Sequence, residues 1–172
     1  MKYFLSIFTL FIFFLSPVNS EQKIVFVDMD KVISASKPGS SIFKQLKNIN
    51  DKNLTFLKNE EAKFKEKEKK LITQKKIISE NDFKVKVDEL KSEINIYNQN
   101  RKKIIGEFNR LKVDSTNKLL KQINPILAKF SKDKKIAIIL QKKNLIMGET
   151  ELDITDEIIK NVNSEIKEFN IK

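Results

Sequence analysis

Residues 87–115 read VDELKSEINIYNQNRKKIIGEFNRLKVDS, and this stretch decides the fold. Its apolar residues recur in steps that alternate between three and four, which is the heptad spacing of a helix that packs along another helix. The spacing therefore predicts a long helix with one apolar seam and a single charged break at Arg101. The seam positions are Val87, Leu90, Ile94, Tyr97, Arg101, Ile104, Phe108, Leu111 and Ser115.

A second column lies upstream, where residues recur every seven positions. Its members are Phe43, Asn50, Leu57, Phe64, Leu71 and Ile78. Between the two columns, residues 79–82 (SEND) combine turn-forming and helix-capping side chains. We therefore predict an antiparallel helical hairpin over residues 41–130 with its tip near 79–82. A continuous parallel coiled coil is the alternative.

A reversal at this cluster also sets the register of the two helices. Phe64 then lies opposite Tyr97, and Glu60 lies opposite Arg101. The charged break in each seam would therefore meet an opposite charge.

Short apolar runs on either side of the hairpin predict strands. These runs are residues 24–27, 136–140 and 145–147, the last of which returns after a turn at 141–144. The hairpin takes most of the chain and leaves too few residues for an independent core. Three short strands with open edges can also pair with strands of another copy. We therefore expect an α+β fold, mostly α, in which the hairpin projects from a small body. The body, residues 21–40 and 131–172, would be completed by strands of other copies in a homo-oligomer.

Three residues carry local signals about the helices. Pro125 is expected to bend its helix because it has no N–H and crowds the preceding turn. Gly106 either lets the helix flex or packs closely against the facing helix. Thr155, followed by two acidic residues, is the predicted N-cap of a terminal helix.

Residues 1–20 are expected to form a secretory signal, not part of the fold. Lys2 precedes the apolar run 3–15, which is too short to span a bilayer. Val18-Asn19-Ser20 ends in a small residue that suits cleavage after Ser20. The mature chain would then be exported, and an uncleaved membrane anchor is the alternative.

The composition closes most enzyme chemistry to this chain. Its 172 residues carry a net charge of +11 and contain neither cysteine nor histidine. This excludes thiolate nucleophiles, disulfides, Cys/His metal sites and histidine-dependent triads. With only three glycines, a glycine-rich phosphate loop is also disfavoured. We therefore expect no catalytic residue, no cofactor and no metal.

One stretch nevertheless resembles an active site. In residues 23–34, KIVFVDMDKVIS, an apolar run ends in Asp28 and Asp30, a spacing similar to that of aspartate-nucleophile phosphatases of the haloacid-dehalogenase superfamily. That chemistry sits on repeated strand-helix units, which this chain lacks. We interpret one of the two aspartates as the cap of a short helix and keep the phosphatase as an alternative.

The end motifs, taken in order, resemble the Skp/OmpH family of periplasmic chaperones. They are residues 23–32 (KIVFVDMDKV), Asn124-Pro125 leading into 135–140 (KIAIIL), and 152–159 (LDITDEII). The resemblance implies a homotrimer in which three arms enclose a cavity. It also implies a periplasmic holdase that works without ATP and keeps unfolded outer-membrane β-barrel proteins from aggregating. Some family members are thought to bind lipopolysaccharide, so contact with lipopolysaccharide or a membrane surface is open here.

Two sets of arm residues are candidates for contact with such clients. Apolar residues off the seam would supply scattered contacts: Phe56, Ile72, Ile77, Val85 and Ile105. Basic residues would attract acidic chains: Arg101, Lys102, Lys103, Arg110 and Lys112. A single exposed hydrophobe or lysine can also be without consequence. No specific nucleic-acid partner is expected, because no base-reading motif is present. The remaining alternative is an exported coiled-coil spacer of the cell envelope.

Overall fold

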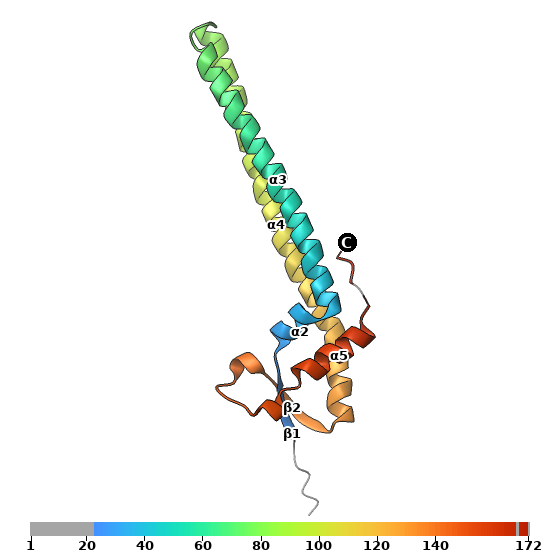
Figure 1. Cartoon of the computed structure of the whole chain (residues 1–172). Helices are drawn as coiled ribbons and strands as arrows, with labels where there is room; N and C mark the ends of the chain where they lie inside the picture. The colour runs from blue at the N-terminus through green and yellow to red at the C-terminus, as the bar shows by residue number, and fades with distance from the viewer. Residues whose placement is uncertain (1–22, 168, 172) are drawn as a thin grey trace, which may run out of the picture.

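The computed structural model describes residues 23–167 and 169–171, so the expected signal segment and its cleavage site lie outside the described residues. A long two-helix arm stands on a small body (Figure 1). This confirms the predicted α+β, mostly helical fold. In chain order the elements are β1 (Lys23–Val27), α2 (Met29–Ala35), α3 (Lys37–Gln74), α4 (Glu80–Asp133), β2 (Ile136–Gln141), the 3-10 turns η1 (Lys142–Asn144) and η2 (Thr150–Leu152), and α5 (Thr155–Glu165).

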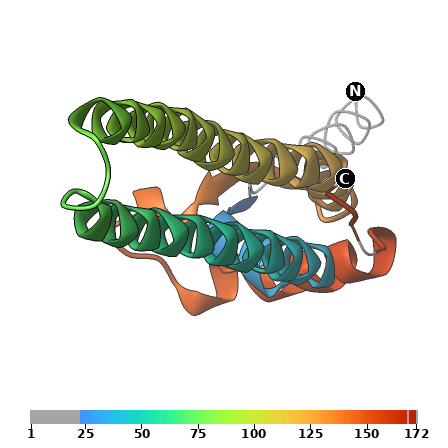
Figure 2. The ribbon, with the colours of Figure 1, turned by 90° about the horizontal axis from the view of Figure 1, so that it is seen from above.

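Helices α3 and α4 form the arm and run side by side in opposite directions (Figures 1 and 2). Residues 75–79 join them, and the Ser79 hydroxyl caps α4 by accepting a hydrogen bond from the backbone N of Asp82 at 3.1 Å. The rings of Phe64 and Tyr97 lie 5.3 Å apart, which confirms the predicted register. The chain therefore forms a hairpin, not a rod.

The predicted seam of α4 is its shielded face. From Val87 to Leu111 the seam positions are half-buried, Ser115 is buried, and Arg101 is exposed, as the charged break requires. The upstream column holds from Asn50 to Ile78, but its first member, Phe43, is 43% exposed. Ile42 and Leu46 are buried instead. A straight helix drifts by about 20° per heptad against a strict seven-residue repeat, so the seam moves to neighbouring residues at the base of the arm.

The confirmed register places Glu60 opposite Arg101, but the two side chains form no ion pair. Glu60 pairs with Lys63, one turn further along the same helix, at 2.6 Å. Arg101 is exposed and makes no ion pair within the part of the chain that the structure describes. The flexible Lys63 side chain reaches Glu60 on its own helix surface, where residues three apart are neighbours.

The sheet of the body differs from the prediction. Strands β1 and β2 pair in parallel, with Ile24 opposite Ile138 and Phe26 opposite Leu140. The predicted return strand at 145–147 is wrong, because the 3-10 turn η1 directs the chain into a loop. Phe26 instead forms an isolated parallel bridge with Asp153, and its carbonyl accepts a hydrogen bond from the backbone N of Ile154 at 3.0 Å.

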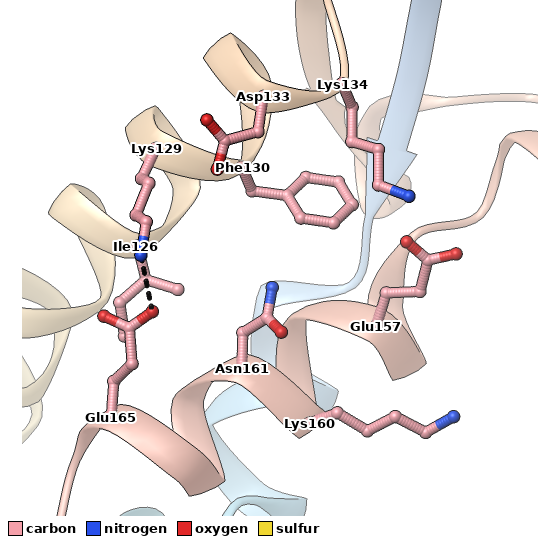
Figure 3. A pocket seen from close by; sticks show the side chains of 9 residues that line it. All are labelled: Ile126, Lys129, Phe130, Asp133, Lys134, Glu157, Lys160, Asn161 and Glu165. Carbon is pink, nitrogen blue, oxygen red and sulfur yellow. Dashed lines mark ion pairs between the residues drawn. The ribbon is translucent and has the colours of Figure 1, made fainter.

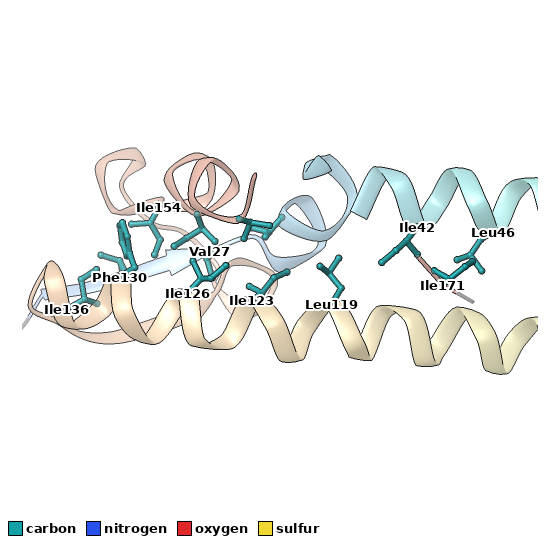
Figure 4. Close-up of a cluster of buried hydrophobic side chains, with 14 residues drawn as sticks. Val27, Ile42, Leu46, Leu119, Ile123, Ile126, Phe130, Ile136, Ile154 and Ile171 are labelled. Atoms are coloured by element: carbon teal, nitrogen blue, oxygen red, sulfur yellow. The ribbon is translucent and has the colours of Figure 1, made fainter. Parts of the chain in front are cut away.

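The core lies where the arm enters the body, between β1, the end of α4 and α5 (Figure 4). Each element contributes one apolar face, which it can bury only by packing against another element. The core residues are Val25, Val27, Val32, Ile42, Leu46, Leu119, Ile123, Ile126, Phe130, Ile136, Ile154, Ile158, Val162 and Ile171.

The structure corrects the predicted N-cap of α5 and decides between the two alternatives for Gly106. Thr155 is not the N-cap of α5: the cap position is Ile154, and the buried Thr155 hydroxyl accepts a hydrogen bond from the backbone N of Asp28 at 2.8 Å. Gly106 does not pack closely against α3, because a Cβ placed there would meet no heavy atom within 4 Å beyond its own helix backbone and chain neighbours. Helix α4 continues through Pro125 to Asp133. Among the described helices, none has a stretch both long and apolar enough to cross a membrane.

Candidate functional site

The five apolar residues predicted as client contacts all expose their side chains along the arm. Ile72 and Ile77 lie at the end of α3 and in the connection that follows, and Val85 lies near the start of α4. Phe56 and Ile105 lie lower on the arm, and the register that aligns Phe64 with Tyr97 also aligns these two. The set is therefore distributed along the arm and does not form one patch.

The structure adds exposed apolar residues that were not predicted, namely Leu54, Ile96 and Val113. Val113 belongs to a column on α4 that repeats every seven residues opposite the seam. The column is Val85, Ser92, Gln99, Gly106 and Val113, all of them exposed and none of them charged. In a chain that is 33% charged, the outermost face of a long helix would ordinarily carry charge. The heptad pattern would have revealed this column, had its outer positions been compared as well as its seam.

The five predicted basic residues are also exposed, all on α4. Two of them have acidic neighbours one turn away: Lys103 lies 4.0 Å from Glu107, and Arg110 lies 3.7 Å from Asp114. Within the described residues, Arg101, Lys102 and Lys112 have no ion-pair partner. This stretch of the arm therefore keeps an excess of positive charge that salt would screen.

The aspartates that resemble a phosphatase site serve the body. Asp28 caps α2 by accepting a hydrogen bond from the backbone N of Lys31 at 2.9 Å, while Asp30 is exposed in the first turn. Lys31 reaches across to Asp156 of α5 at 2.7 Å, and this bond raises the pKa of Lys31. Within the described residues, no group of three or more acidic side chains could hold a metal ion. Asp28 therefore serves as a helix cap, and the Lys31–Asp156 pair joins α2 to α5.

Asp153 holds the loop that precedes α5. Its carboxylate accepts hydrogen bonds from the Lys142 ammonium at 2.7 Å and from the Thr155 backbone N at 3.0 Å. Burial acts to raise the pKa of Asp153, but the hydrogen bonds from Lys142 and Thr155 outweigh it and lower that pKa. The Lys142 ammonium also lies 5.7 Å from the centre of the Phe26 ring. The carboxylate therefore links η1 to α5, and Lys142 extends this link to β1.

The sheet leaves an apolar outer face. Ile24, Ile138 and Leu140 are exposed on it, whereas their neighbour Phe26 is covered by the loop at Gly148. A Cβ at Gly148 would lie 2.6 Å from the Phe26 ring, so this loop passes directly over the ring. The same loop carries the fully exposed Ile146 and Met147, which is 86% exposed. The exposed apolar loop was not predicted, because residues 145–147 were expected to form a strand.

A pocket of about 360 Å³ lies on the body between the end of α4 and α5 (Figure 3). Its wall combines three lysines (Lys129, Lys134 and Lys160) with three acids (Asp133, Glu157 and Glu165), and Lys129 pairs with Glu165 at 3.9 Å. Because the opposite charges are mixed and open to solvent, the pocket favours neither an anion nor a cation.

Comparison with known proteins gives one family and one fold. The sequence profile of the family described as outer membrane protein (OmpH-like) matches residues 23–162. An OmpH-like protein from Caulobacter crescentus CB15, known from its crystal structure, superposes with a TM-score of 0.81 over 88% of this chain and 89% of that chain. The two sequences are 15% identical, so this likeness shows a shared fold. No curated protein matches the sequence.

Proposed function

This chain belongs to the OmpH-like family, a family of chaperones, and we propose that it is a periplasmic holdase. It keeps unfolded outer-membrane β-barrel proteins from aggregating, and it needs no ATP to do so. The observation that carries this proposal is the arm surface. Exposed apolar side chains, such as Phe56 on α3 and Val113 on α4, are distributed along the arm among charged and polar residues. An arm that served only as a spacer would need no such side chains.

The physical mechanism follows from the chemistry of the client. A transmembrane β-strand alternates apolar and polar residues, so an unfolded barrel protein offers many separate apolar side chains. Covering one of them contributes about 25 cal/mol per Å² of apolar area removed from water. Several such contacts hold the client, while each one is weak enough to break singly. The chaperone can therefore release its client without an energy source, and it needs neither a catalytic residue nor a cofactor.

The basic residues of α4 would add long-range attraction. Arg101, Lys102, Lys103, Arg110 and Lys112 would speed the encounter with acidic segments, an effect that decreases as salt rises. The same positive surface would permit contact with lipopolysaccharide or a membrane surface. Attraction of this kind is sequence-independent, so it gives no reason to expect a specific nucleic-acid partner.

We also propose that three copies assemble through the body. The support is the apolar outer face of the sheet, Ile24, Ile138 and Leu140, together with the exposed loop residues Ile146 and Met147. A two-stranded sheet with an apolar face is marginal in isolation. Sedimentation equilibrium of the mature chain should give the mass of a trimer, and Ile146→Asp should shift it towards monomer. Ile72→Asp on the arm is the matched control and should leave the mass unchanged.

An aggregation assay tests the holdase. An outer-membrane β-barrel protein is diluted from urea into buffer with and without the mature chain, and light scattering is followed. We expect suppression near one trimer per client, and weaker suppression with an unfolded soluble protein. Absence of suppression at that ratio, with the trimer intact, would contradict the proposal and favour the envelope spacer.

A further inference from the structure

The chain beyond α5 returns to the base of the arm (Figure 1). We define residues 166–167 and 169–171 as the brace segment. Ile171 is only 5% exposed and belongs to the core, where it lies beside Ile42 and Leu46 of α3 (Figure 4). Ile166 and Phe169 pack against the same core. Residues of the body thus reach the first turns of the arm.

One side chain of α3 forms two hydrogen bonds with the backbone of the brace segment. The Gln45 amide nitrogen donates a hydrogen bond to the carbonyl of Phe169 at 2.6 Å, and its amide oxygen accepts one from the backbone N of Ile171 at 3.3 Å. The Gln45 amide thus offers one N–H donor and one oxygen acceptor, the same two groups that the backbone of a neighbouring strand would offer. The brace segment is therefore fixed to α3 by hydrogen bonds as well as by the burial of Ile171.

On its other side the brace segment faces α4 at Pro125. A groove there is lined by Lys121, Gln122, Pro125 and Ile126 of α4, and by Ile166 and Phe169 of the brace segment. Pro125 has no N–H to donate to the carbonyl of Lys121, so the helix lacks one stabilising bond at this turn. Helix α4 runs without interruption from the arm into the body, so the missing bond makes this turn a local weak point of the helix.

We propose that the brace segment limits bending of the arm at Pro125. It ties α5, α4 and α3 together beside the turn where α4 lacks a backbone hydrogen bond, and so fixes the direction of the arm relative to the body. Its residues lie beyond the range 23–162 that the family profile matches. The proposal rests on these contacts and does not depend on the holdase activity.

Distance measurements between spin labels test the brace. The chain contains no cysteine, so labels can be attached at Lys58→Cys on the arm and Lys160→Cys on α5, both exposed positions. Labelled chains are diluted into an excess of unlabelled chains so that distances within one chain dominate. Ile171→Asp should broaden the distance distribution. Lys167→Ala removes an exposed side chain of the brace segment and should leave it unchanged.

Two further variants separate bracing from general damage. Gln45→Ala leaves the apolar core intact and should broaden the distribution without abolishing cooperative unfolding. Pro125→Ala restores the missing backbone donor, so adding it to either variant should narrow the distribution again. An unchanged distribution in Gln45→Ala would overturn the brace. A distribution that stays broad after Pro125→Ala would overturn Pro125 as the site of bending.

Discussion

The ring of Tyr97 on α4 lies 5.3 Å from the ring of Phe64 on α3, and its hydroxyl donates a hydrogen bond to the Glu61 carboxylate at 2.9 Å. Burial, followed by this hydrogen bond, raises the pKa of Tyr97, so the phenol stays neutral and able to donate. An edge-tilted ring pair tolerates little sliding, since its favourable geometry is specific. These two residues therefore hold the register of α3 and α4 at this level of the arm.

The register predicts a cross-link one heptad closer to the tip. Leu71 and Leu90 line the same small cavity between the helices. Cysteines at positions 71 and 90 should form a disulfide within one chain on oxidation, which electrophoresis with and without reductant would detect. Cysteines at 72 and 90 are the control and should not, because Ile72 is exposed. A bond that forms only between chains would contradict the hairpin.

Two glycines in helices should respond in opposite directions to alanine. A Cβ at Gly39 would clash with the carbonyl oxygen of Ile33, where α2 ends against α3. Gly39→Ala should therefore destabilise the protein by about 1–3 kcal/mol through overpacking. Gly106 faces open space, so Gly106→Ala should stabilise it by about 0.5–1 kcal/mol. Urea unfolding measures both, and equal effects would contradict the packing at α2.

The sequence predicted the arm well because its information is local and repeated. Leu90, Tyr97 and Ile104 recur at one spacing, and any single exception, such as Arg101, leaves the pattern readable. The error at Phe43 arose where the repeat ends and the drift of a straight helix decides which residue faces inward. The ion pair between Glu60 and Arg101 does not form because Glu60 has a closer partner, Lys63, on its own helix.

The body was less predictable because its pairings are long-range. The apolar runs at β1 and β2 were recognised, but nothing local states that they pair in parallel across the whole arm. Residues 145–147 have strand-like composition and yet lie in a loop, since a strand requires a partner edge. The brace segment has no periodicity at all, and its role depends on Gln45, far away in the sequence.

Stability should depend on pH through Asp153. Its pKa in the folded protein lies below the ordinary value of 3.8, so the folded state favours the carboxylate. The resulting stability is fully present above the pKa of the unfolded chain and is lost as the pH falls through the lower folded pKa. Asp153→Asn should therefore be destabilising at pH 7, and the difference from the wild type should shrink below pH 3.8. Urea unfolding at several pH values measures this.

An exposed aspartate on the arm provides the control for the loss of stability at pH 7. Asp51→Asn should leave the free energy of unfolding at pH 7 close to that of the wild type. A loss of stability in Asp153→Asn that stays constant from pH 7 to the most acidic measurable point would show that Asp153 acts by packing, not by its charge.

The client-contact residues near the tip should affect binding without affecting folding. Ile72 and Ile77 are among the most exposed apolar residues of the arm, so replacing both with serine should change the free energy of unfolding by less than about 0.5 kcal/mol. Covering such a side chain against a client contributes about 1.5–3 kcal/mol when burial is complete. If the client covers both side chains only partly, the double serine variant loses about 1.4 kcal/mol of binding free energy. Its affinity for the client should therefore be roughly tenfold weaker.

Fluorescence titration of a labelled, urea-diluted barrel protein would measure this loss. Lys76→Ser lies between the two isoleucines and is exposed, so it tests whether any change at the tip suffices. We expect it to shift the salt dependence of binding slightly and to leave the affinity at high salt unchanged, because it removes charge and no apolar contact. Equal affinities for the double serine variant and the wild type at high salt would show that the tip residues are exposed hydrophobes without a role in client binding.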